Sequence, residues 1–131
     1  MDETTLEHLV GAWLPLPDVA ERMGTDVGKV RRMLADGTLV AVRLGERKVL
    51  GVPERFLRPA DEGWTVLPAL AGTVSVLRDS GFADDEAVAW LFTPDPSLAD
   101  LGTGAPTLTP VDALAAGHKT EIRRRAQALA I

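Results

Sequence analysis

The apolar residues between Leu16 and Gly37 follow the spacing of two short helices joined by a tight turn. In the second helix, 27–36, apolar side chains recur every three positions from Val27 to Met33, so they share one side. Gly24 suits the end of the first helix, because glycine adopts a positive φ at no steric cost. The pattern predicts a helix-turn-helix.

A β-hairpin is predicted over residues 39–52. Two runs rich in valine and leucine, 39–42 and 48–52, flank a turn that contains Gly45. From Leu67 onward the apolar spacing becomes that of longer helices, and a segment rich in proline and glycine interrupts it.

These patterns predict a mainly α fold. We expect a winged helix-turn-helix with a small β-hairpin in residues 16–58, followed by a C-terminal helical bundle in residues 64–131 that packs on it. Residues 1–15 are expected to form an N-terminal lead-in that is a short helix or a flexible segment. At 131 residues the chain is one domain, or one small domain with a helical extension.

Charge is distributed unevenly along this acidic chain. The formal net charge is −5, yet residues 16–58 hold nine Lys and Arg against six Asp and Glu. Residues 1–15 carry a net charge of −3, and residues 59–131 carry −5. A partner meets the charge within a Debye length of about 10 Å rather than the charge of the whole chain. The helix-turn-helix segment is therefore the part that would attract an anionic partner.

The composition also bears on compartment and chemistry. Without cysteine the chain can form neither a disulfide nor a thiolate site. No basic, apolar leader opens the chain, and no apolar run approaches the roughly 18 residues of a membrane span, so a cytoplasmic, nucleoid-associated protein without membrane contact is expected. No acid–base pair, nucleophile with its base, or metal-binding cluster stands out, so neither enzyme activity nor a cofactor or metal is expected.

The order helix, turn, helix and basic hairpin is typical of DNA-binding domains. A helix fits the major groove, where Arg and Lys bind guanine edges or phosphates, and a hairpin wing contacts the backbone. We predict that helix 27–36 reads double-stranded DNA and that hairpin 39–52 contacts its backbone, as in a transcriptional regulator. The predicted contacts are Thr25, Lys29, Arg31, Arg32, Arg43, Arg47 and Lys48. The alternative is an ordinary solvated basic face on a small helical domain.

Three other features are more typical of residues that stabilise the fold than of residues that bind a ligand. The acids at 84–86 suit a helix N-terminus, and the arginines at 123–125 suit a helix C-terminus near acidic neighbours, with DNA contact as the alternative. Trp64 and Trp90 lie in apolar surroundings and are expected to anchor the core rather than to stack on bases.

Two segments carry a resemblance to known proteins. Leu16–Val52 resembles the MerR/excisionase-like winged helix-turn-helix. The string WLFTPDPSL at 90–98, the helix start TPVDAL at 109–114 and the terminal RRRAQA resemble the C-terminal domain of a small actinobacterial DNA-binding family. That family includes a substrate of a membrane serine/threonine kinase. The resemblance implies DNA binding and phosphorylation near the N-terminus, where Thr4 and Thr5 are the threonines present.

A second resemblance concerns the C-terminal helices alone. The Trp-Leu and proline pattern followed by a Thr-Pro helix start is similar to the toxin-binding C-terminal domain of Xre-type antitoxins. It implies the competing hypothesis, a protein-interaction module in which residues 64–131 bind a protein partner or a second copy of the chain.

Overall fold

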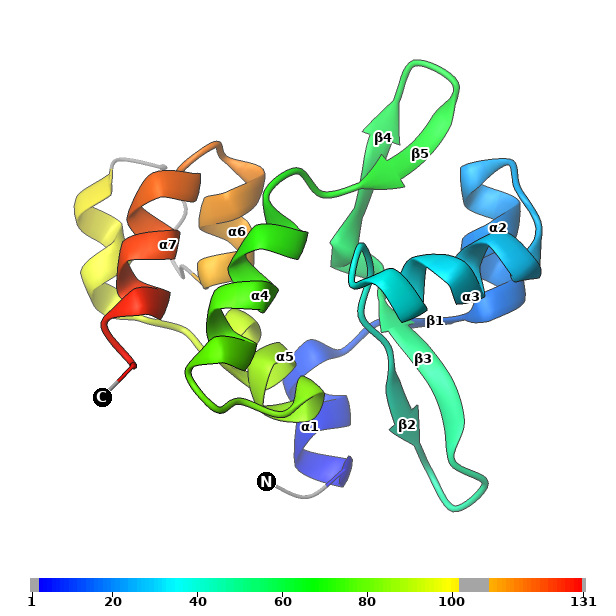
Figure 1. The fold of residues 1–131 in the computed structure, drawn as a ribbon, viewed down its shortest axis with the longest axis horizontal. Coiled ribbons are helices and arrows are strands. Elements are labelled where there is room, and N and C mark those ends of the chain that lie inside the picture. The colour runs from blue at the N-terminus through cyan, green and yellow to red at the C-terminus, as the bar shows by residue number, and fades with distance from the viewer. Residues whose placement is uncertain (1–2, 102–108, 131) are drawn as a thin grey trace.

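The computed structural model describes residues 3–101 and 109–130 and shows a mainly helical protein with two small antiparallel sheets (Figure 1). The predicted fold class is confirmed. The helices are α1 (Glu3–Val10), α2 (Leu16–Met23), α3 (Val27–Asp36), α4 (Leu70–Asp79), α5 (Asp84–Phe92), α6 (Pro110–Ala115), α7 (Lys119–Gln127) and the 3-10 turns η1 (Glu54–Phe56) and η2 (Pro96–Leu101). The strands are β1 (Trp13–Pro15), β2 (Val42–Leu44), β3 (Val49–Pro53), β4 (Leu57–Ala60) and β5 (Gly63–Val66).

Helices α2 and α3 form the helix-turn-helix. Gly24 ends α2 at φ 68°, and the N–H groups of Gly24 and Thr25 donate to the carbonyls of Glu21 and Ala20. Val19 and Val30 are fully buried between the two helices and the rest of the core. The tight turn exists because glycine occupies the left-handed position without a Cβ penalty.

The wing is a three-stranded sheet with the order β1-β3-β2. Strand β2 pairs antiparallel with β3, with Val42 opposite Gly51 and Leu44 opposite Val49. The other edge of β3 pairs with β1, with Leu14 opposite Val52. The N-terminal lead-in thus holds a helix and a strand. Three residues ending in proline are too short for an alternating pattern to show, so the sequence did not predict β1.

A second hairpin, β4–β5, connects the two halves and rises from the top of Figure 1. Strand β5 packs on α2, where the guanidinium of Arg22 lies 4.9 Å from the ring centre of Trp64. The same arginine lies 3.7 Å from a carboxylate oxygen of Glu54. Trp64 is half-buried against the edge of the core and also anchors this hairpin to the helix-turn-helix. Trp90 is likewise half-buried against the core.

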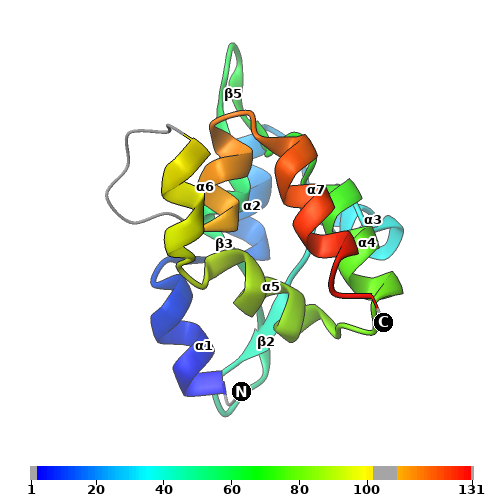
Figure 2. The ribbon, with the colours of Figure 1, turned by 90° about the vertical axis from the view of Figure 1, so that its left-hand side faces the viewer.

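The C-terminal helices pack around α5, with α4 and α7 side by side (Figures 1 and 2). Their apolar residues join those of the helix-turn-helix in one core. Phe56, from η1, is fully buried and lies 5.7 Å from Phe92 of α5, ring centre to ring centre. The acids at 84–86 begin α5, and Glu86 accepts a hydrogen bond from the N–H of Ala83 at 2.9 Å. Within residues 3–101 and 109–130, no helix is long and apolar enough to cross a membrane.

Candidate nucleic-acid interface

Helix α3 exposes several cations because its apolar side packs in the core. Val30 and Met33 are buried, whereas Lys29, Arg31 and Arg32 are exposed. The helix starts at Asp26, whose side chain accepts a hydrogen bond from the N–H of Lys29 at 2.7 Å. This cap fixes the first turn of the helix, where unpaired N–H groups and the helix dipole favour an anion.

Removing the cap should loosen that first turn. We expect Asp26→Ala to lower the free energy of unfolding by about 1 kcal/mol, because one N–H of the first turn loses its acceptor. Urea unfolding followed by circular dichroism measures the change. Asp26→Asn is the matched control, since asparagine still accepts the bond and should retain most of the stability. Equal losses in the two variants would contradict the capping role.

The β2–β3 turn holds the second group of cations. Gly45 has φ 71° and Lys48 has φ 54°, and the N–H of Lys48 donates to the carbonyl of Gly45 at 3.2 Å. The Arg43 guanidinium donates to the carbonyl of Lys48 at 3.2 Å, which ties this side chain across the hairpin. Glu46, Arg47 and Lys48 are all exposed at the tip.

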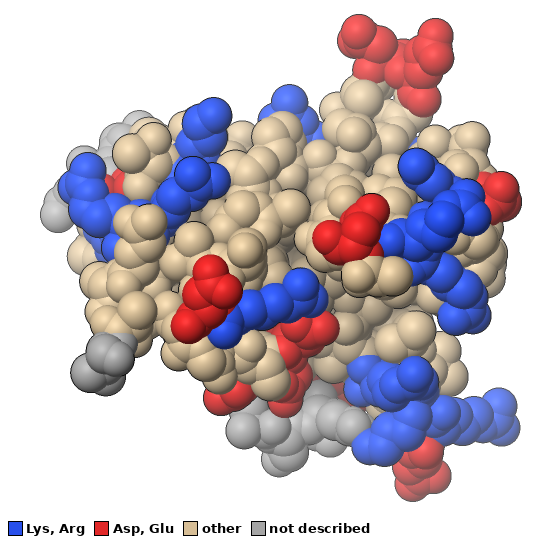
Figure 3. Space-filling model, in the orientation of Figure 1, with Lys and Arg blue, Asp and Glu red and all other residues tan. Residues whose placement is uncertain are grey.

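A groove of about 350 Å³ lies between α3, the start of α2 and the wing. Its basic lining residues come from two successive elements: Arg31 from α3, and Arg43, Arg47 and Lys48 from the hairpin. Val27, Leu50 and Val49 add apolar lining. In Figure 3 cations gather over α3 and over the hairpin tip. The predicted wing residues and Arg31 are therefore brought together on one concave, basic surface.

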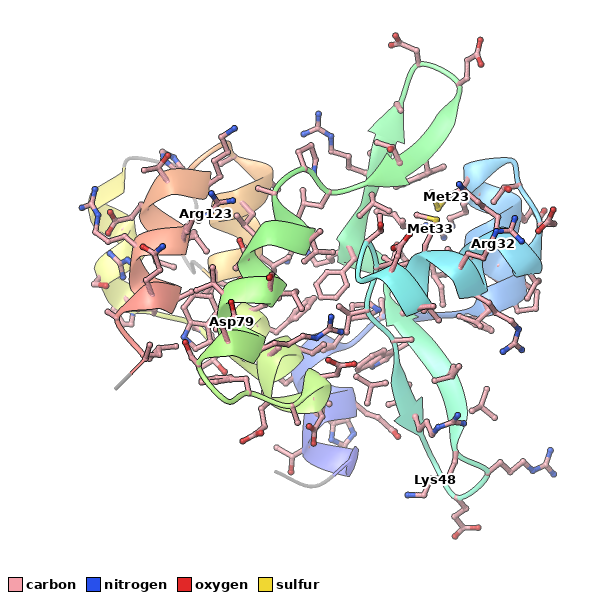
Figure 4. All side chains as sticks on the ribbon, in the orientation of Figure 1. Met23, Arg32, Met33, Lys48, Asp79 and Arg123 are labelled. Carbon is pink, nitrogen blue, oxygen red and sulfur yellow. The ribbon has the colours of Figure 1, made fainter. Side chains whose placement is uncertain are left out.

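Lys29 and Arg32 lie on the neighbouring side of α3, outside the lining of this groove. Figure 4 shows Arg32 on the surface of α3 and Lys48 at the wing tip. Arg32 folds back along its own helix, and its guanidinium lies 3.6 Å from the position that a Cβ on Gly28 would occupy. Thr25 is exposed in the turn that precedes α3. Helix α3 thus presents cations on two adjacent sides.

The far end of α3 carries a fixed negative charge. The Thr38 hydroxyl donates to the carboxylate of Asp36 at 2.5 Å, and this bond, with that from the Thr38 N–H, holds the pKa of Asp36 below its usual value. A phosphate is disfavoured beside an ionised carboxylate. Carboxylates thus lie at both ends of α3, Asp26 at its start and Asp36 at its end, and the exposed cations lie between them.

The three arginines at 123–125 on α7 differ in their neighbours. Arg124 and Arg125 each pair with Glu121, at 3.1 and 3.0 Å, and Arg125 also lies 3.1 Å from Asp95. The Ser97 hydroxyl, with a smaller effect from Arg125, holds the pKa of Asp95 below its usual value. Arg123 lies across Gly72 of α4 (Figure 4). Two of the three arginines thus have the acidic neighbours that the sequence predicted.

Two residues of this region were not among the sequence predictions. Val49 is 54% exposed in the basic groove, although it is a large apolar side chain in a strand. Its place directly after the basic turn residues Arg47 and Lys48 was the available signal. The other is Glu7, which contacts the wing turn from 38 residues away in the sequence.

The threonines that the sequence offers for phosphorylation, Thr4 and Thr5, lie in the first turn of α1, and Thr5 is exposed.

Comparisons with known proteins match both halves of the chain. Residues 3–57 match the family model described as the winged helix-turn-helix domain of the DNA-binding protein Rv2175c, and residues 67–130 match the Rv2175c C-terminal domain of unknown function. The chain is 42% identical over 119 residues to the DNA-binding protein Rv2175c of Mycobacterium tuberculosis, covering 88% of this chain and 78% of that protein. It is also similar to the NMR structure of Rv2175c, with a TM-score of 0.72 and 38% identity over 92% of this chain and 82% of that one.

Proposed function

Because the chain belongs to the family of the DNA-binding protein Rv2175c, we propose that it binds double-stranded DNA through the surface formed by α3 and the β2–β3 wing. The observation that carries this proposal is the basic groove, in which Arg31 of α3 meets Arg43, Arg47 and Lys48 of the wing. Cations from a helix and from the hairpin that follows it converge there in an otherwise acidic chain, and such a surface suits a phosphate backbone.

Helix α3 enters the major groove in this proposal. A helix with its side chains is about 10–12 Å across and the groove is about 12 Å wide, so both sides of the helix meet its walls. Lys29 and Arg32 then contact bases or phosphates on one side, and Arg31 does so on the side nearest the wing. Thr25, exposed in the turn before α3, would donate its hydroxyl to a phosphate in this arrangement. The hairpin lies on the adjacent backbone.

Binding through the wing should show in the salt dependence of affinity. We expect log K to fall linearly with log salt, and Arg43→Ala with Arg47→Ala to reduce that slope by about 1.8, since each phosphate contact contributes about 0.9. Fluorescence anisotropy with a labelled duplex of about two helical turns, between about 50 and 200 mM salt, measures the slope. The double variant Lys119→Ala with Arg123→Ala removes two exposed cations of α7 and should leave the slope nearly unchanged. Equal slopes for the wild type and the wing variant would refute wing contact.

Transcriptional regulation is the biological role that we propose for this binding. A monomer offers only a handful of cations, so affinity should be modest, and sequence-specific control would need self-association or a partner. Selection from a random pool of duplexes with the purified protein tests specificity directly. Enrichment of one sequence supports a regulator, whereas retention of DNA without enrichment supports a general DNA-binding protein.

A further inference from the structure

The side chain of Glu7 connects helix α1 to the tip of the wing. The Gly45 N–H, in the β2–β3 turn, donates to the Oε1 atom of Glu7 at 3.2 Å. Figures 1 and 2 both place α1 beside the lower part of the hairpin. The hydrogen bond therefore joins the first helix of the chain to the turn that carries Arg47 and Lys48.

The backbone around Glu7 is held in place by burial and by hydrogen bonds. Leu6 and Val10 of α1 are buried in the core, at 2% and 8% exposure. The carbonyl of Glu7 accepts hydrogen bonds from the Gly11 N–H at 2.9 Å and from the Trp13 indole at 3.3 Å. Trp13 belongs to β1, which pairs with β3 of the wing. The backbone that carries the Glu7 carboxylate is thus fixed relative to the base of the hairpin.

The charge of Glu7 works against the role proposed for the wing. A carboxylate at this turn repels the phosphates that Arg43, Arg47 and Lys48 would attract. Its hydrogen bond, by contrast, restrains a hairpin tip that otherwise projects from the protein. We propose that Glu7 is a positioning residue, which holds the wing turn so that its cations face α3. This inference rests on the proposed DNA binding by the wing.

Charge and hydrogen bonding can be separated, because their effects on affinity have opposite signs. Glu7→Gln removes the charge and keeps an oxygen acceptor, so it should bind duplex DNA as tightly as the wild type or up to roughly twofold tighter. Glu7→Ala removes both, and should bind roughly threefold to tenfold more weakly than Glu7→Gln, the range expected for one net hydrogen bond. Glu46→Gln, at the same exposed turn, reports the effect of charge alone.

A second measurement does not depend on DNA. In the free protein, NMR should show faster hydrogen exchange at the Gly45 amide in Glu7→Ala than in Glu7→Gln, while the amides of α3 remain unchanged. A wild type that fails to bind DNA would refute the proposed function without affecting this comparison. Equal affinities of the two Glu7 variants, or equal exchange at Gly45 in both, would overturn the positioning role.

Discussion

Replacing Lys29 and Arg32 together by alanine should lower the affinity for duplex DNA by about 10- to 100-fold. Both side chains are exposed on α3, the helix that we place in the major groove. Each lost contact to a base or phosphate costs roughly 1 kcal/mol or more, and the salt slope should fall by about 1.8 if both residues contact phosphate. Titration of a labelled duplex at low salt measures both quantities, and circular dichroism verifies that α3 is retained.

Two comparisons make this test specific. Lys119→Ala with Arg123→Ala removes the same charge from α7 and should change the affinity less than about threefold, because exposed charges beyond a Debye length are screened. Across different duplexes, a base contact changes the ranking of sequences, whereas a phosphate contact weakens all of them alike. Unchanged binding by the α3 variant would show that this helix is not the reading element.

Phe56→Ala should destabilise the protein by about 3–5 kcal/mol. The Phe56 ring is fully buried, and its nearest aromatic neighbour, Phe92, belongs to α5 in the other half of the chain. The cavity would therefore open between the helix-turn-helix and the C-terminal helices. We expect a single cooperative unfolding transition at a lower denaturant concentration, since both halves contribute to one core.

Phe82 provides the control for this prediction. It is partly buried beside the same core, so Phe82→Ala should cost clearly less than Phe56→Ala. Tryptophan fluorescence and circular dichroism report different parts of the chain during urea unfolding. If the two signals separated in Phe56→Ala alone, Phe56 would still join the halves. If neither the midpoint nor the coincidence of the signals changed, the ring would not be part of a shared core.

Much of the fold could be predicted from local patterns. The spacing from Val27 to Met33 and the glycines at 24 and 37 fix α3, and its structural bounds, Val27–Asp36, match the prediction. These signals are local, because side-chain spacing and a left-handed cap act within one helix. Strands β1, β4 and β5 have only three or four residues, and their partners determine whether they form. Nothing in such short segments distinguishes a strand from a loop.

The same distinction between local patterns and tertiary contacts applies to the candidate interface. The residue types at Arg31, Arg43 and Arg47 indicate a basic surface, but only the packing of the wing against α2 and α3 places them around one groove. Lys29 and Arg32 differ from Arg31 in direction because successive helix residues are rotated by about 100°. Glu7 could not be predicted, since its contact joins segments that no sequence pattern connects.

The sheet order β1-β3-β2 has a consequence for how the protein folds and for how it opens locally. Strand β1 comes first in the chain, yet its partner β3 follows some 35 residues later, so their pairing closes one of the long loops of the fold. A growing chain cannot complete the wing until the whole helix-turn-helix has been made. Because the ends of this loop meet in the wing, local opening of the N-terminal segment and of the wing should occur as one cooperative event.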